Sequence, residues 1–126
     1  MTALIVDDSR AMRMLLRQAL EDLQLNVLEA RDGREGLEQL RAHRDIAFAL
    51  VDWNMPEMTG IELLKAARSE PSLAGVRLIM VTSQSDVNHI QTALAAGADE
   101  YVMKPFTDGT IEDKLRLLGL LQETRS

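Results

Sequence analysis

Short apolar runs punctuate the chain and are separated by longer stretches of mixed character. The runs lie at residues 3–6, 26–30, 46–51, 76–81 and 100–103. Each is only a few residues long and several are rich in Val and Ile, a composition that is typical of β-strands. The runs at 46–51 and 76–81 are almost wholly apolar, as expected of strands that are buried on both faces of a sheet. The pattern therefore predicts five strands.

The stretches between the runs have helical periodicity. In the first, apolar residues recur on one face of a helix, at Met12, Leu15, Leu16, Ala19, Leu20 and Leu23. Weaker patterns predict four more helices, near residues 33–43, 60–69, 86–96 and 108–121. Thr59 and Glu62 have the spacing of a capping box at the start of one of them. Gly97 stands where a glycine commonly ends a helix.

The alternation of strands and helices predicts an α/β fold. Repeated βα units imply a doubly wound parallel sheet of five strands, with helices on both faces. No linker, internal repeat or low-complexity segment interrupts the pattern. We therefore expect one domain over residues 1–122, followed by a short polar tail at residues 123–126.

Composition narrows the class of protein. The chain has 126 residues, of which 46% are hydrophobic and 27% charged, as in soluble globular domains. No apolar run is long enough for a transmembrane helix, and no signal peptide is recognisable, so membrane insertion is not expected. Cysteine is absent, which excludes disulfides and thiolate metal sites and fits a cytoplasmic protein. The net charge of −6, without a Lys/Arg-rich run, disfavours direct binding of nucleic acid.

Polar residues follow four of the five predicted strands. Asp7 and Asp8 follow the first strand, Asp52 the third, Thr82 the fourth and Lys104 the fifth. Ligands bind outside the carboxyl ends of parallel strands, which share one edge of the sheet, so we expect these side chains to converge. Two carboxylates about 4 Å apart repel by roughly 4 kcal/mol at an effective dielectric constant of about 20. Either the pair is solvated at a turn, or a nearby cation offsets the repulsion; three acids crowded together favour the cation.

This set of side chains favours phosphoryl transfer. Carboxylate ligands without His or Cys suit Mg²⁺, Mn²⁺ or Ca²⁺. Lys104 would supply a positive point charge for an anion, and Thr82 a neutral hydrogen-bond donor. A metal, a lysine and a hydroxyl around a carboxylate can stabilise a transferring phosphoryl group. The carboxylate can itself be the nucleophile, which gives an acyl phosphate.

Two rings near these residues are given no chemical role. Trp53 follows Asp52 directly, and we expect its side chain to be exposed beside the site. His89 lies in a polar helical setting, and we expect it to be solvated.

Several motifs, in their order and spacing, resemble one family. They are VDD at 6–8, DWNMP at 52–56, Gly60, VTS at 81–83 and YVMKPF at 101–106. Together they resemble the receiver domains of response regulators, most closely the CheY-like single-domain regulators of chemotaxis. The resemblance covers the chain from Ala3 to about Leu118. It implies a flavodoxin-like (βα)5 fold with strand order 2-1-3-4-5.

The resemblance also implies a role for each acidic residue. Asp52 would be the phosphoacceptor. Asp8 and Asp52 would bind Mg²⁺ directly, together with the backbone carbonyl of Asn54, while Asp7 would act mainly through water. Mn²⁺ would be a substitute metal. Asn54 and Gln84, each two residues after a site residue, would tune the lifetime of the acyl phosphate.

Residues on other strands would contact the phosphoryl group. Lys104 would pair with it, and Thr82 would donate a hydrogen bond to it. Tyr101 would turn inward when Thr82 is drawn toward the phosphate. The Lys104–Pro105 peptide bond would be cis.

The function implied is that of a phosphorylation-controlled binding module, not an enzyme with a separate turnover reaction. A sensor histidine kinase would donate the phosphoryl group, and a phosphatase is a further partner to expect. The downstream target, such as the flagellar motor switch, would dock on the surface of the predicted helix 86–96, strand 100–103 and helix 108–121. The protein would act as a monomer or as a phosphorylation-dependent dimer.

Four alternatives remain open at this point. Two share the fold: a phosphorelay carrier that passes the group to a histidine phosphotransfer protein, and a receiver excised from a multidomain regulator. An aspartate-nucleophile phosphatase would carry a second Asp where this chain has Asn54. An FMN-binding flavodoxin relative would need a phosphate cradle in its first loop, and DDSRA at residues 7–11 lacks its hydroxyls and glycines.

Overall fold

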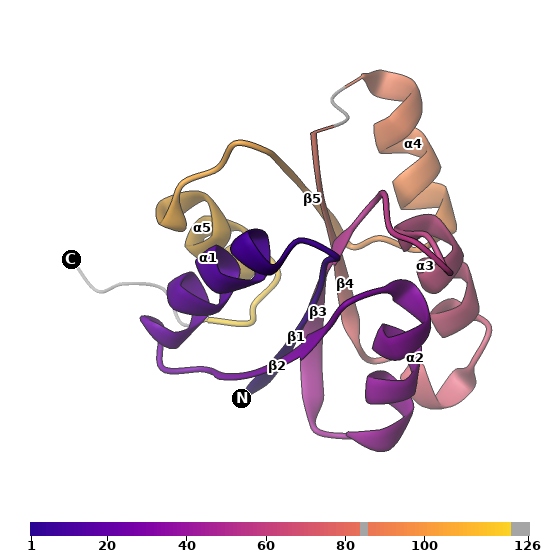
Figure 1. Cartoon of the computed structure of the whole chain (residues 1–126), viewed down its shortest axis with the longest axis horizontal. Coiled ribbons are helices and arrows are strands. Elements are labelled where there is room, and N and C mark those ends of the chain that lie inside the picture. Colours follow the sequence, from indigo (N-terminus) through magenta and orange to yellow (C-terminus); the bar gives the residue numbers. More distant parts are fainter. Residues whose placement is uncertain (84–85, 122–126) are drawn as a thin grey trace.

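The computed structural model describes residues 1–83 and 86–121, and strands alternate with helices throughout them (Figure 1). The strands are β1 Thr2–Val6, β2 Asn26–Ala30, β3 Ile46–Asp52, β4 Arg77–Thr82 and β5 Glu100–Met103. The helices are α1 Arg10–Glu21, α2 Gly33–Ala42, α3 Gly60–Arg68, α4 Val87–Ala96 and α5 Asp108–Leu117, with a 3₁₀ turn η1 at Pro71–Leu73. Gln84 and the tail at residues 123–126 lie outside the described residues.

The strands form one parallel sheet in the order β2-β1-β3-β4-β5, so the predicted fold class and strand order are confirmed. The chain starts at β1, moves outward to β2, and then crosses back to β3 on the other side of β1. This reversal puts helices on opposite faces of the sheet. It also brings the carboxyl ends of β1 and β3 together, because Val6 lies beside Val51 in the register of the two strands.

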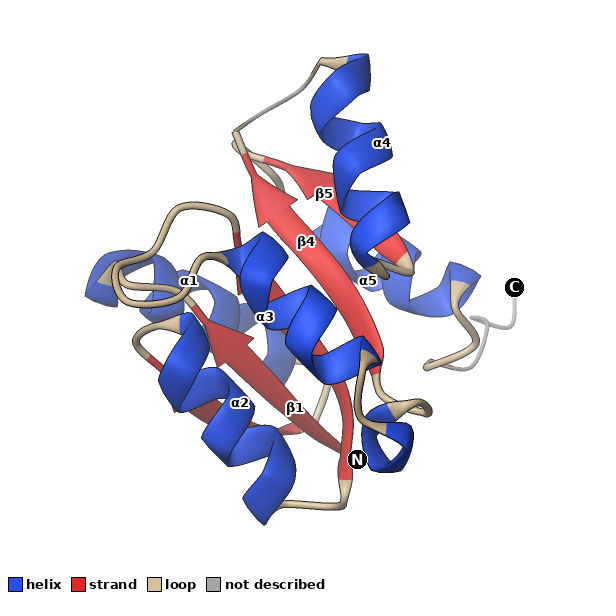
Figure 2. Cartoon of the chain, turned by 90° about the vertical axis from the view of Figure 1, so that its right-hand side faces the viewer, coloured by secondary structure: helices blue, strands red, loops and turns tan. Residues whose placement is uncertain are grey.

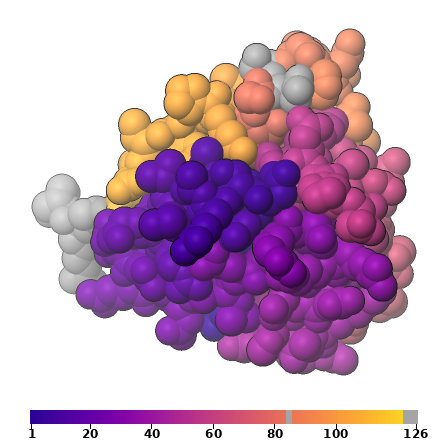
Figure 3. All heavy atoms as spheres, viewed as in Figure 1, coloured from indigo at the N-terminus to yellow at the C-terminus, as the bar shows by residue number. Residues whose placement is uncertain are grey.

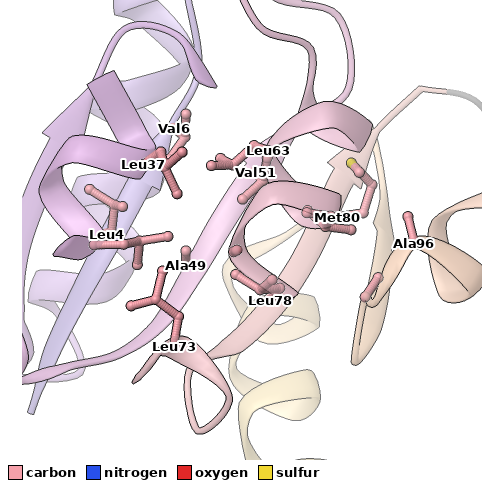
Figure 4. Packing of buried hydrophobic residues seen from close by; sticks show 14 of the residues in the cluster. Leu4, Val6, Leu37, Ala49, Val51, Leu63, Leu73, Leu78, Met80 and Ala96 are labelled. Carbon is pink, nitrogen blue, oxygen red and sulfur yellow. The ribbon is translucent and has the colours of Figure 1, made fainter. Parts of the chain in front are cut away.

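Side chains alternate between the two faces of the sheet and build two core layers. On one face, Leu4, Val6 and Val51 pack with residues of α2, α3 and α4 (Figures 2 and 4). On the other, Ile5 and Leu50 pack with residues of α1 and α5, which form adjoining parts of the surface (Figure 3). Every residue of β1 is buried, as expected of a strand at the centre of a doubly wound sheet.

Helix ends follow local capping chemistry. Thr59 and Glu62 form the predicted capping box at the start of α3. Gly97 ends α4 in a left-handed conformation with φ 115°, which a glycine adopts without strain. The predicted helix 108–121 was too long: α5 ends at Leu117, because Gly119 takes φ 74° and the Leu120 N–H turns back to the Leu115 carbonyl.

No helix in the described part of the chain combines the length and the apolar character needed to cross a lipid bilayer.

Replacement of Gly60 by alanine is expected to destabilise the protein. A Cβ atom on Gly60 would lie 2.2 Å from the backbone oxygen of Asp52, so either α3 or the end of β3 would have to move. We expect the free energy of unfolding to fall by about 3 kcal/mol, as in other cases of overpacking. Urea unfolding of Gly60→Ala measures this fall, with Gly75→Ala as the control because no atom lies within 4 Å of a Cβ there. Equal stabilities for the two variants would contradict the steric argument.

Candidate functional site

Three carboxylates meet at the carboxyl edge of the sheet. Asp7 and Asp8 follow β1 and Asp52 ends β3, and one oxygen from each lies within 4.8 Å of the others. Asp7 is buried, Asp52 is half-buried and Asp8 is exposed. The cluster is therefore anchored on its inner side and open to solvent on its outer side. The structure thus brings the three acids together, as the sequence predicts.

Lys104 reaches this cluster from beyond β5. Its Nζ lies 3.0 Å from Oδ1 of Asp52 and 3.4 Å from Oδ2 of Asp7. Its backbone N–H donates to the carbonyl of Thr82 at 2.8 Å, which fixes the start of the loop after β5 to the end of β4. The ammonium group of Lys104 therefore partly compensates the negative charge of Asp7 and Asp52.

Burial and neighbouring charges shift the pKa values of Asp52 and Lys104. Burial raises the pKa of Asp52, and the charge of Asp7 adds to this; the hydrogen bond from Lys104 acts in the opposite direction but does not outweigh them. Burial alone would lower the pKa of Lys104, but the hydrogen bond to Asp52 and the charges of both acids raise it. Lys104 therefore stays in its charged form, whereas the folded protein disfavours ionisation of Asp52.

Asp7 is held by its backbone as well as by its side chain. Its Oδ1 accepts the N–H of Ser9 at 2.8 Å, and its own N–H donates to the carbonyl of Ala30 at 3.1 Å. Its carbonyl accepts Nη1 of Arg13 at 2.8 Å. Sequence reasoning missed Arg13, because an arginine on an amphipathic helix gives no signal that it bonds to a backbone carbonyl.

Thr82 and Tyr101 are both buried, on neighbouring strands of the sheet. Asp52 pairs in register with Val81, so Thr82 stands one residue further along β4 at the same edge as the acids. Burial raises the pKa of Tyr101, and the charge of Asp86 at the start of α4 adds to the rise. These two residues thus link the site edge to the side of the sheet that carries α4 and β5.

Two further predicted site features, Asn54 and the Lys104–Pro105 peptide bond, lie in described loops. Asn54 is exposed in the loop after β3. The Lys104–Pro105 peptide bond is cis, the isomer that the family resemblance implies. Gln84 lies outside the described residues.

The side chains of Trp53 and His89 are less exposed than the sequence suggests. Trp53 is half-buried against the core layer that contains Val51 and Leu63, and its ring meets that of His89 edge-on, with centroids 5.0 Å apart. The imidazole of His89 is also 2.6 Å from the carboxylate of Asp86. The loop after β3 therefore contacts α4 directly, a contact between distant residues that helical and strand periodicity does not predict.

The donor set fits a hard divalent cation. All three clustered side chains offer carboxylate oxygens, and the exposed position of Asp8 leaves room for water and a substrate oxygen. Magnesium typically uses one or two carboxylates and keeps several waters. The residues present could therefore hold such an ion.

A groove lies beside the site, between α4, β5 and α5. Its volume is about 500 Å³, and it is lined by Ile90 of α4, Tyr101 and Met103 of β5, and Lys114 of α5, among others. Met103 is exposed. This is the surface that the resemblance assigns to a downstream partner.

Comparison with known proteins agrees with the fold and the motifs. The family model described as the response regulator receiver domain matches residues 3–116. The chain is 40% identical over 119 residues to the chemotaxis protein CheY1 of Helicobacter pylori, which covers 94% of this chain and 96% of that protein. It is 40% identical over 116 residues to a CheY homologue of Campylobacter jejuni, covering 91% and 89% of the two chains.

A solved structure gives the same picture. The chemotaxis protein CheY4 of Vibrio cholerae superposes with a TM-score of 0.86 at 32% identity, covering 92% of this chain and 96% of that one. Family model, relatives and structure all span nearly the whole chain. The chain therefore belongs to the response regulator receiver domain family of two-component signalling and is homologous to the CheY chemotaxis regulators.

Proposed function

We propose that this protein is a response regulator of chemotaxis that accepts a phosphoryl group on Asp52 from a sensor histidine kinase. The observation that carries the proposal is the position of the Asp52 carboxylate. It lies in a cluster of three acids and 3.0 Å from Nζ of Lys104, at the edge of the sheet where ligands bind. This arrangement surrounds one nucleophilic oxygen with groups that can hold a metal and an anion.

Mg²⁺ is the cofactor that we propose, with Mn²⁺ as a substitute. Asp8 and Asp52, with the backbone carbonyl of Asn54, would hold it directly. Asp7 would act mainly through water, because its carboxylate is already engaged by the Ser9 N–H and by Lys104. When bound, the ion would neutralise charge between Asp52 and the phosphoryl oxygens.

The protein groups that the reaction needs all lie at this edge of the sheet. A carboxylate oxygen of Asp52 attacks the phosphorus of a phosphohistidine, a P–O bond forms, and the P–N bond breaks with its electron pair returning to the imidazole nitrogen. Lys104 moves from pairing with the free carboxylate to pairing with the phosphoryl group. Thr82 then donates a hydrogen bond from its hydroxyl group to a phosphoryl oxygen. Asn54 and Gln84 would set how long the acyl phosphate lasts.

Signal output would follow from a shift between two conformations. Movement of Thr82 toward the phosphoryl group would let Tyr101 turn further inward, which reshapes the groove that Tyr101 lines. A partner that binds one shape better shifts the population toward it. We propose the flagellar motor switch as that partner, docking on α4, β5 and α5, with a phosphatase to reset the signal. The protein would act in the cytoplasm, as a monomer or a phosphorylation-dependent dimer, without a separate turnover reaction.

Intact-mass measurement tests the chemistry. After incubation with Mg²⁺ and acetyl phosphate, we expect a single adduct of about 80 Da, the mass of one added phosphoryl group. The adduct should fail to form when EDTA removes the metal ion. A donor of this kind isolates the chemistry of this chain from the choice of kinase.

Two results would contradict the proposal. One is the absence of any adduct with Mg²⁺, under conditions in which another receiver domain is phosphorylated. The other is an adduct that forms equally well with EDTA, because the acid cluster would then have no part in the reaction.

A further inference from the structure

Arg13, in the first turns of α1, joins the acid-bearing loop to the neighbouring strand β2. Its Nη1 donates to the carbonyl of Asp7 at 2.8 Å, and its Nε donates to Oε1 of Glu29 at 3.0 Å. The side chain is only 13% exposed. Glu29 lies on β2 beside Ile5 of β1, so the guanidinium bridges from the sheet to the peptide just beyond the end of β1.

We propose that Arg13 is a positioning residue for the metal-binding acids: by holding the carbonyl of Asp7, it sets the direction of the peptide that carries Asp8. This inference rests on the proposed function, in which Asp8 and Asp52 hold Mg²⁺. A guanidinium suits the role because its planar fork presents donors in fixed directions, so one side chain can satisfy the carbonyl and Glu29 together.

Other contacts of this loop involve groups on either side of the Asp7–Asp8 peptide. The N–H of Asp7 is bonded to Ala30, and its carboxylate is bonded to the N–H of Ser9 and to Lys104. The side chain of Asp8 is exposed, so its direction depends on the backbone that carries it. Rotation of the Asp7–Asp8 peptide would swing Asp8 relative to Asp52, and the Arg13 contact opposes that rotation.

The positive charge of Arg13 is compensated by neighbouring glutamates, so it does not oppose cation binding at the acid cluster. Glu29 accepts Nε of Arg13 and also Nε of Arg17, at 3.0 and 2.7 Å, and Arg17 further pairs with Glu21 at 3.2 Å. Two arginines are thus matched by two glutamates. The group can position the acids without adding a net positive charge that would repel the metal ion.

Arg17 offers a matched control within the same group. It lies one helical turn after Arg13, joins the same helix to the same strand, and bonds to the same Glu29 carboxylate. Its backbone contact, however, is with the carbonyl of Val27 at 3.3 Å and not with the acid loop. If Arg13 merely ties α1 to β2, replacement of either arginine should have similar consequences.

The experiment compares Mg²⁺ binding by the wild-type protein, Arg13→Gln, Arg13→Lys and Arg17→Gln. Binding is measured by isothermal titration calorimetry and by the fluorescence of Trp53, the single tryptophan, which follows Asp52 directly. Urea unfolding in EDTA reports the stability of each variant separately. We expect Arg13→Gln to raise the Kd for Mg²⁺ by about tenfold, the size of effect seen when groups that orient metal ligands are removed.

The variants should separate the two roles of the arginines. Arg13→Lys should bind Mg²⁺ with intermediate affinity, since an ammonium can still reach one of the two acceptors. Arg17→Gln should keep the wild-type Kd within twofold, whatever stability it loses. The inference is overturned if Arg13→Gln keeps the wild-type Kd, or if both glutamine variants weaken Mg²⁺ binding equally. A wild-type protein that does not bind Mg²⁺ would instead overturn the proposed function, and this inference with it.

Discussion

The Asp52→Asn protein is expected to form no phosphoryl adduct and, in metal-free buffer, to be more stable than the wild type. The loss of the adduct follows from the chemistry, because a neutral amide oxygen cannot serve as the attacking carboxylate. The intact-mass assay with acetyl phosphate and Mg²⁺ measures it. Asp8→Asn is the control, since it weakens metal binding but leaves the acceptor in place, and its adduct should form more slowly at limiting Mg²⁺.

The gain in stability follows from the electrostatics of the site. Burial and the neighbouring charge of Asp7 raise the pKa of Asp52, so ionised Asp52 destabilises the folded protein even with Lys104 at 3.0 Å. Asparagine keeps the shape but removes the charge, and Lys104 can then serve Asp7 alone. We expect a gain of about 1 kcal/mol in urea unfolding at neutral pH, a typical size for a single substitution.

The stability difference between Asp52→Asn and the wild type should depend on pH. A carboxyl group whose pKa is raised by folding stabilises the folded protein only while it is protonated, because the folded state then binds more protons than the unfolded chain. This contribution is present below the ordinary pKa of 3.8 and is lost as the pH rises through the raised pKa of Asp52. The advantage of Asp52→Asn should therefore shrink as the pH is lowered through that range.

Two outcomes would count against this account of Asp52. An adduct that persists in Asp52→Asn would show that another residue is the acceptor. A variant that is less stable than the wild type in EDTA would mean that the ion pair with Lys104 outweighs burial and the charge of Asp7. The first result concerns the chemistry of the site and the second its electrostatics, so each part can fail separately.

The sheet and the convergence of the acids were predictable because both depend on periodicity and direction. A strand buried on both faces must be apolar along its whole length, as 46–51 and 76–81 are. Once the strands are parallel, residues that follow them must meet at one edge, whatever the loops do. Asp7, Asp52 and Lys104 therefore come together although up to 97 residues separate them in the chain.

Other contacts depended on features that the residue pattern does not carry. Arg13 bonds to a backbone carbonyl, and any polar residue could have occupied that place on the amphipathic helix α1. The contact of Trp53 with His89 depends on how α4 lies over the loop after β3. The end of α5 was misplaced because leucines continue beyond it, whereas Gly119 has already turned the chain.

Lys104→Met is expected to destabilise the metal-free protein at neutral pH. Methionine retains an unbranched side chain of similar length but removes the ammonium group that lies 3.0 Å from Asp52 and 3.4 Å from Asp7. The Asp7 side chain is only 2% exposed and that of Asp52 12%, so two poorly solvated carboxylates would face each other without a cation. Breaking a fully buried pair costs 3–5 kcal/mol, and the open side of this cluster should reduce the loss to about 2 kcal/mol.

Mg²⁺ and acid should each restore the stability of Lys104→Met, because each removes the same repulsion. Ligand binding stabilises the folded state by an amount that grows with the logarithm of the ligand's affinity. Acids without a competing ammonium should bind the cation more tightly, so Mg²⁺ should raise the free energy of unfolding by more than in the wild type. Lys104 lowers the pKa of Asp52, so without it that pKa should rise further and the deficit should shrink as the pH falls. Lys104→Arg keeps the charge and should remain close to the wild type in EDTA. Two results would contradict this prediction: a free energy of unfolding for Lys104→Met equal to that of the wild type in EDTA, or a gain from Mg²⁺ no larger than in the wild type. The ammonium group would then not compensate the acids, and there would be no electrostatic reason for Lys104 to change its pairing from Asp52 to a phosphoryl group.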